Sequence, residues 1–239
     1  HVLMIAKSVK SVKAVINVTT DKCYENREWH WPYRENDRLG GTDPYSASKA
    51  CVEILNNSIY KSFYKNNNIG LASVRAGNVI GGGDWGNDRL VPDILSAIEG
   101  EKEVILRCPK SVRPWQHVME PLSGYVSLAQ KLFRDPQNFS EPFNFGPRIE
   151  NVVPVEELVK QICSLFDRES KYLFQQGTIL HEAQTLNLDS SKAHKRLNWF
   201  PKWSLKQTCQ SLFDWHNAHY RGQNMNLLTK QQISRFLKS

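Results

Sequence analysis

The chain has 239 residues, 40% of them hydrophobic, and carries a formal net charge of +7. This length can bury a core in one or two domains, and no run approaches the roughly 18 apolar residues that a membrane helix needs. Lysines and arginines are scattered among acidic residues rather than gathered in a basic arm, which argues against nucleic acid as a partner.

The cysteines and histidines give no sign of a disulfide framework or a metal site. The five cysteines are an odd number, lie far apart and form no C-x-x-C pair, so we expect a reducing cytoplasm. His216 and His219 have a spacing that suits two metal ligands on a helix, but no third ligand stands nearby. The opening stretch 1–6 is too short for the core of a signal peptide. We therefore predict a soluble, unexported protein without a metal.

The first half of the chain predicts a βαβ unit. Residues 1–10 resemble the end of a helix, and 14–18 form an apolar, β-branched run typical of a strand buried on both faces. A helical segment from about 45 to 65 follows, and 70–75 is a second strand. This order predicts two parallel strands joined by a right-handed crossover.

Helices and strands continue to alternate in the second half. We expect a glycine-rich loop at 81–86, a short strand around 103–107, and helices near 90–99, 121–133, 154–166, 190–197 and 205–219, with Asp189 as a cap of the fourth of these. The predicted fold class is α/β: an incomplete Rossmann-type, doubly wound parallel sheet with a smaller C-terminal α/β substrate-binding domain. Residues 1–80 would be the C-terminal half of the dinucleotide-binding domain. Residues 81–239 would be mostly substrate-binding domain, with some segments returning to the sheet.

A glycine-rich dinucleotide motif is absent from the chain. A doubly wound sheet of this kind normally starts with a strand, a G-x-G-x-x-G turn and a helix. The chain instead opens in a helical pattern, without methionine, so we expect roughly 100 residues of βα units before it. The Gly81–Gly83 run is no phosphate-binding P-loop, because no Lys-Ser or Lys-Thr pair follows it.

Two short segments carry candidate catalytic chemistry. Tyr45 and Lys49 lie four residues apart, on one face of the helix that starts there. An ammonium beside a phenol favours the phenolate, which suits a general base. Thr20 and Asp21 come directly after the first strand, where ligands bind in open α/β sheets. By itself each pattern also has a purely structural explanation. The spacing of Tyr45 and Lys49 also occurs on an exposed helix, and Thr20 and Asp21 also fit a turn after a strand.

Four longer strings carry a resemblance to a known family. They are Thr20–Tyr24 (TDKCY), Asp43–Ala50 (DPYSASKA), Arg75–Trp85 (RAGNVIGGGDW) and Arg113–Val118 (RPWQHV). The chain resembles the extended short-chain dehydrogenase/reductase family, among the NAD-dependent epimerases and dehydratases, and within it the CDP-glucose 4,6-dehydratases. The resemblance covers essentially the whole chain. It implies NAD as cofactor, a nucleotide-sugar substrate, a homodimer, and a role in deoxysugar and polysaccharide biosynthesis.

The resemblance also implies catalytic roles. Tyr45 would take the proton from the sugar 4-hydroxyl as hydride leaves C4 for NAD, Thr20 would hydrogen-bond that hydroxyl, and Lys49 would hold the nicotinamide ribose. The resulting ketone acidifies the C5 proton, water is lost across C5 and C6, and the hydride returns to C6. Asp21 would protonate the departing hydroxyl. Lys22 stands where related dehydratases commonly carry glutamate and would be the base, if its amine is neutral.

For substrate binding, the resemblance points to Asn78 at the sugar diphosphate, and Arg89 and Arg113 are candidate contacts to pyrophosphate or base. Arginine suits this role because its planar fork can bind two phosphate oxygens. Arg113 could instead pair with a surface acid, and Asn78 could cap a turn. We expect His117 to be a packing residue beside Trp115. Two alternatives remain: a 4-epimerase of the same family, and an inactive fragment that lacks the NAD pyrophosphate site.

Overall fold

The computed structural model describes residues 1–167, 172–174 and 185–239, and the chain divides into two units. The first unit contains His1–Gly77, Glu120–Gly146 and Leu186–Pro201. The second contains Asn78–Met119, Pro147–Thr185 and Lys202–Ser239. Each unit thus gathers segments that are far apart in the sequence.

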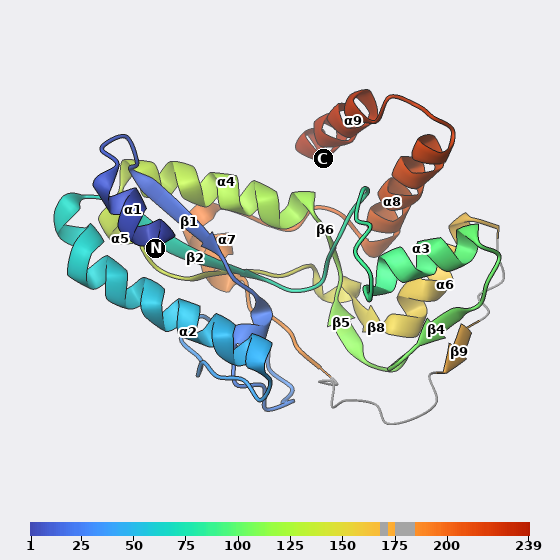
Figure 1. Ribbon diagram of the computed structural model, residues 1–239, viewed down its shortest axis with the longest axis horizontal. Coiled ribbons are helices and arrows are strands. Elements are labelled where there is room, and N and C mark those ends of the chain that lie inside the picture. Colours follow the sequence, from blue (N-terminus) through green and yellow to red (C-terminus); the bar gives the residue numbers. More distant parts are fainter. Residues whose placement is uncertain (168–171, 175–184) are drawn as a thin grey trace. The chain divides into compact units, whose positions relative to one another are not determined.

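The first unit is built on a parallel sheet (Figure 1). Its elements are α1 (Val2–Ser8), β1 (Ala14–Val18), the 3₁₀ turn η1 (Asp21–Cys23), α2 (Pro44–Ile59), the π-helical turn η2 (Tyr60–Tyr64), the 3₁₀ turn η3 (Lys65–Asn67), β2 (Gly70–Ala76), α4 (Met119–Arg134), α5 (Pro136–Phe139), β7 (Phe143–Phe145) and α7 (Ser191–Leu197).

The strand order is β1-β2-β7, and both pairs are parallel. This confirms the predicted α/β fold with a parallel sheet. The expectation that β1 is buried on both faces is wrong. β2 lies between two partners and is buried almost throughout, whereas β1 pairs with β2 alone among the described strands. Four of the residues of β1 are only half-buried, and Val18 is exposed.

Helices cover both faces of this sheet. On one face, side chains of α4 and α7 such as Leu128 and Leu197 pack with Val74 and with the phenylalanines of β7. On the other face, Ile59 and Tyr64 from the end of α2 and from η2 pack against Leu71. The helical segment is predicted to end near residue 65. The α-helix ends at Ile59, passes through η2 and η3, and the chain turns at Asn68 with a left-handed backbone (φ 53°).

The second unit contains three two-stranded sheets and four long helices among its described residues. Its elements are β3 (Val79–Ile80), α3 (Leu90–Glu99), β4 (Val104–Leu106), β5 (Val112–Pro114), β6 (Gln116–His117), the 3₁₀ turn η4 (Ile149–Asn151), β8 (Val152–Pro154), α6 (Val155–Leu165), β9 (Tyr172–Phe174), α8 (Leu205–Tyr220) and α9 (Met225–Lys238). β3 with β6 and β4 with β9 are parallel pairs, and β5 with β8 is antiparallel.

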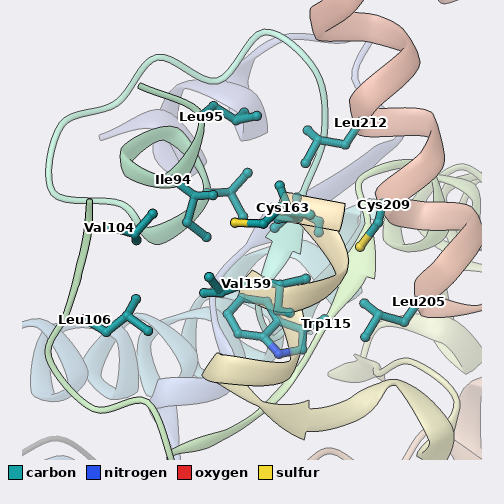
Figure 2. Packing of buried hydrophobic residues seen from close by; sticks show 14 residues of the cluster. Ile94, Leu95, Val104, Leu106, Trp115, Val159, Cys163, Leu205, Cys209 and Leu212 are labelled. Atoms are coloured by element: carbon teal, nitrogen blue, oxygen red, sulfur yellow. The ribbon is translucent and has the colours of Figure 1, made fainter. Parts of the chain in front are cut away.

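One hydrophobic core holds the second unit together. Figure 2 shows aliphatic side chains of α3, α6 and α8, among them Ile94, Val159 and Leu212, gathered with Trp115. Burial of a large aliphatic side chain contributes about 1.5–3 kcal/mol. The predicted helices at 90–99, 154–166 and 205–219 are confirmed, because their apolar faces form this core.

Candidate active site

The Thr20–Lys22 segment begins where β1 ends. Thr19 continues the pairing for one residue, with its N–H donating to the Val74 carbonyl at 2.9 Å. Thr20 then caps η1, and its hydroxyl accepts from the Lys22 N–H at 3.3 Å and donates to the Asp21 carboxylate at 3.1 Å. Thr20 and Asp21 are buried, while Lys22 is exposed. The turn therefore places a hydroxyl and a carboxylate side by side.

Helix α2 begins at a well-formed cap. The Asp43 carboxylate accepts from the Ser46 N–H at 3.0 Å and from the Ser46 hydroxyl at 2.5 Å, and Pro44 occupies the first helical position. These bonds from Ser46, aided by the positive charge of Lys22, hold the pKa of Asp43 below its usual value. The cap fixes the first turn of the helix, which contains Tyr45.

Tyr45 and Lys49 lie one turn apart on α2, as their spacing predicts. The Lys49 Nζ lies 5.8 Å from the centroid of the Tyr45 ring. The tyrosine side chain is 51% exposed, and Lys49 is half-buried. A phenol with a neighbouring ammonium is thus accessible at the start of the helix.

The two segments with candidate catalytic residues meet in the first unit. Helix α2 packs against η1, and the effect of Lys22 on Asp43 also brings the turn and the helix start together. Since α2 returns antiparallel to the parallel strands β1 and β2, its start lies at their carboxyl ends. Ligands of parallel α/β sheets bind at this edge.

A buried ion pair beneath this region was missed by the sequence reasoning. Glu53 on α2 and Arg75 on β2 are joined at 2.7 Å, and each side chain is only 2% exposed. Burial raises the pKa of Glu53, but the hydrogen bond and charge of Arg75, with hydroxyls of Ser73 and Thr19, hold it below the usual value. One signal was available: Glu53 follows Lys49 by one helical turn, and Arg75 is the one charged residue of a strand that is otherwise uncharged.

Of the predicted substrate-binding residues, Thr20 belongs to the first unit, and Asn78, Arg89 and Arg113 belong to the second. The Asn78 carbonyl accepts from the Gln116 N–H at 3.0 Å, just before β3. Arg89 is exposed, and its Nη1 lies 3.1 Å from the Asp84 carboxylate. Arg113, on β5, is buried, with Nη1 donating to the Val112 carbonyl at 3.0 Å. Arg113 is therefore a buried arginine and not a surface one.

The glycine-rich loop packs on helix α8 within the second unit. A side chain at Gly82 would place Cβ 2.1 Å from Trp215, and Gly83 has a positive φ of 83°. These glycines let the loop lie directly on the indole of Trp215. Trp85 belongs to the same cluster of rings, and its ring centroid lies 5.3 Å from that of His216. Close approach to the Trp215 ring explains Gly82, and the positive φ explains Gly83.

His117 is a buried packing residue, but its neighbour differs from the expected one. Its ring centroid lies 4.9 Å from that of Trp203, rather than beside Trp115. Nδ1 accepts from the Met119 N–H at 3.3 Å. Burial, with a small contribution from Arg235, lowers the pKa of His117 to about 4, so the ring is neutral.

The described part of the chain has neither a cluster of metal ligands nor a helix that could cross a membrane. No group of three or more His, Cys, Asp or Glu side chains in 1–167, 172–174 and 185–239 has an arrangement that could hold a metal ion. In the same residues, no helix has the length and apolar character needed to cross a membrane.

Comparison with known proteins identifies the family. The sequence model described as GDP-mannose 4,6 dehydratase matches residues 1–212. The chain belongs to this dehydratase family. As a member, it is 48% identical to the CDP-glucose 4,6-dehydratase of Salmonella typhimurium, over all of this chain and 68% of that protein. It is 24% identical to a dTDP-glucose 4,6-dehydratase of Xanthomonas campestris, over 84% of this chain and 57% of that protein.

A solved structure gives the same fold for this family member. The dTDP-glucose 4,6-dehydratase of Bacillus anthracis, in complex with NAD, aligns with a TM-score of 0.74 at 21% identity, over 90% of this chain and 65% of that one. The chain thus spans between about half and two-thirds of the length of the relatives it matches.

Proposed function

We propose that the full-length protein containing this chain is a hydro-lyase that converts CDP-glucose to CDP-4-keto-6-deoxyglucose with NAD as a recycled cofactor. The observation that carries the proposal is the 48% identity to a CDP-glucose 4,6-dehydratase along the whole chain. Such a product serves deoxysugar biosynthesis.

The described residues fit the nicotinamide end of NAD. Tyr45 is exposed, Lys49 is half-buried beside it, and both lie at the carboxyl edge of the parallel sheet. A phenol and an ammonium are suitable partners for ribose hydroxyls. When bound, NAD accepts a hydride from the sugar and later returns it.

Tyr45, Thr20 and Lys49 serve the oxidation. Tyr45 removes the proton of the sugar 4-hydroxyl, and the charge of Lys49 stabilises the negative charge on the phenol oxygen. The Thr20 hydroxyl hydrogen-bonds the same sugar oxygen. Its present bonds to Asp21 and to the Lys22 N–H hold this hydroxyl in one place.

Asp21 and Lys22 serve the elimination. The 4-ketone acidifies the C5 proton, and Lys22 is the proposed base that removes it. Asp21 protonates the departing 6-hydroxyl. The burial of Asp21 next to Thr20 supports this role, because it keeps the acid close to the reacting sugar and away from bulk water.

Asn78, Arg89 and Arg113 bind the nucleotide diphosphate. Two arginines offer bidentate donors to phosphate oxygens, and Arg89 would exchange its bond to Asp84 for one to the substrate. The charge of +7 favours an anionic substrate.

We also propose a cytoplasmic homodimer. Unpaired, widely spaced cysteines support the compartment, since the described ones are all free. The exposed apolar side chains Ile54 and Leu55 of α2 support an interface between copies. Light scattering of the full-length protein would measure the subunit number, and a monomer at working concentration would refute the dimer.

The proposed reaction is tested by supplying CDP-glucose to the full-length protein and following the product by mass spectrometry. We expect the loss of one water molecule and a 4-keto sugar, with CDP-glucose preferred over dTDP-glucose and GDP-mannose. Interconversion of CDP-glucose with its C4 epimer, without loss of water, would support the epimerase alternative. No reaction with any nucleotide sugar would refute the proposal.

A further inference from the structure

One carboxylate joins the catalytic helix to both neighbouring strands. Glu53 accepts hydrogen bonds from the Thr19 hydroxyl at 2.5 Å, the Ser73 hydroxyl at 2.5 Å and Arg75 Nη2 at 2.7 Å. Thr19 is the residue before Thr20, and Ser73 and Arg75 belong to β2. Glu53 therefore connects the helix that carries Tyr45 and Lys49 to the segment that carries Thr20.

Arg75 extends the network to the loop beyond the catalytic turn. Its Nη1 donates to the Tyr24 hydroxyl at 2.7 Å and to the Glu35 carbonyl at 3.2 Å. The Tyr24 hydroxyl in turn donates to Asn144 of β7 at 2.8 Å. The chain that follows Asp21 and Lys22 is thus held to the same arginine.

Stability alone is a poor explanation for such a pair. Desolvation of two charges offsets much of their attraction, and replacing a buried pair with apolar side chains is often neutral or stabilising. Charged hydrogen bonds, in contrast, are directional. The charged hydrogen bonds of Glu53 therefore fix the rotation of α2 about its axis and its position along that axis. Apolar contacts constrain both less tightly.

The geometry of Tyr45 depends on this position of the helix. Glu53 lies one turn beyond Lys49 and two turns beyond Tyr45, along one side of α2. Displacement of a reacting group by about 1 Å can lower a rate by about 100-fold. We infer that Glu53 is a positioning residue, which through Thr19 and Arg75 sets the distance between the Tyr45–Lys49 pair and Thr20. This inference rests on the proposed dehydratase function.

A double substitution separates positioning from folding. Glu53→Gln alone would leave the Arg75 charge buried without a counter-charge, so the informative variant is Glu53→Leu with Arg75→Met, made in the full-length protein. The double variant is expected to fold, with kcat for CDP-glucose at least about tenfold lower and KM within about twofold of the parent. NAD, measured by calorimetry, is expected to bind at least about threefold more weakly, because Lys49 is displaced.

Two further variants serve as references. Tyr64→Phe removes another buried hydrogen bond, from the Tyr64 hydroxyl to the Leu3 carbonyl at 2.6 Å, at the far end of the same helical run. It should keep the parent kcat and NAD affinity. Glu53→Asp keeps the charge on a shorter side chain and should recover part of the kcat lost in the double variant.

The outcomes distinguish this inference from the proposed function. A folded double variant with kcat and NAD affinity within about twofold of the parent would overturn the positioning role, while the dehydratase function would stand. If the parent does not dehydrate CDP-glucose but the double variant still binds NAD more weakly, the proposed function fails and the positioning role is supported.

Discussion

Gly41→Ala is expected to disturb the start of helix α2, which carries Tyr45 and Lys49. Gly41 lies just before the cap of α2, and an added Cβ would sit 2.3 Å from the Ser46 Cβ and 2.7 Å from the Ser46 carbonyl carbon. The backbone of Gly41 has no positive φ, so the substitution causes no conformational strain of its own. Its effect is therefore a steric one.

The size of the effect of Gly41→Ala on stability and kcat depends on which part of the chain moves to relieve the clash. Ser46 is buried and held by both bonds to Asp43, so its side chain cannot turn away. The clash is relieved by moving the first turn of α2, with Tyr45. Overpacking of this kind costs about 1–3 kcal/mol of folding free energy. A shift of Tyr45 by about 1 Å would lower kcat about 100-fold.

Urea unfolding and kcat for CDP-glucose measure the two effects. Gly40→Ala is the control, because its Cβ would meet the Glu25 Cβ at 3.3 Å, a contact that a shift of a few tenths of an ångström relieves. The control should remain near the parent in both measurements. Parent-like stability and kcat in Gly41→Ala would refute the proposed coupling between this close contact and Tyr45.

Three other predictions concern separate parts of the chain. Asp21→Asn should abolish loss of water but leave oxidation at C4 detectable, and equal loss of both would count against Asp21 as the acid. Burial, with the charge of His219, lowers the pKa of His216 to about 4. As the pH falls, the unfolded chain therefore binds the proton of His216 before the folded chain does. The free energy of unfolding should fall by about 2 kcal/mol between about pH 7 and about pH 5 because of this one residue. His216→Phe should remove this component of the urea-unfolding profile, and an unchanged pH dependence would contradict the assignment. Gly124→Ala would place Cβ 2.2 Å from the buried Phe145 ring, so overpacking of about 1–3 kcal/mol should outweigh the gain of about 1 kcal/mol in helix propensity. A more stable variant would show that the ring can move aside.

The sequence predicts the elements that have a long periodic pattern. The β-branched run Ala14–Val18 and the helix that contains Tyr45 are found where the pattern puts them. Asp189 also acts near its predicted position: its carboxylate accepts from the Ser191 N–H at 2.7 Å, although the helix is capped formally by Ser190.

Short and tertiary features were not predictable in this way. β7 has only three residues, Phe143–Phe145, and is recognisable as a strand only through its pairing with β2. Helix α9 has an Asn224 cap but few buried side chains, so its apolar pattern is weak. The exposure of β1 depends on which strands flank it, which a local pattern cannot specify.

The residue types of the candidate site were predictable from the sequence, but the buried hydrogen bonds that hold these residues in place were not. The spacing of Tyr45 and Lys49 and the position of Thr20 after a strand are local signals. The bond between Glu53 and Arg75 joins residues 22 positions apart on different elements. Sequence reasoning on single motifs does not reveal such a pair, because burial decides its importance.

The fate of the hydrogen at sugar C4 tests the central claim most directly. The full-length protein is given CDP-glucose with deuterium at C4, and the product is examined by NMR spectroscopy. A dehydratase that recycles NAD transfers the deuterium within one molecule to C6 of the 4-keto-6-deoxy sugar. Deuterium that remains at C4 of an epimerised sugar, or that is lost to solvent before it reaches C6, would contradict the account.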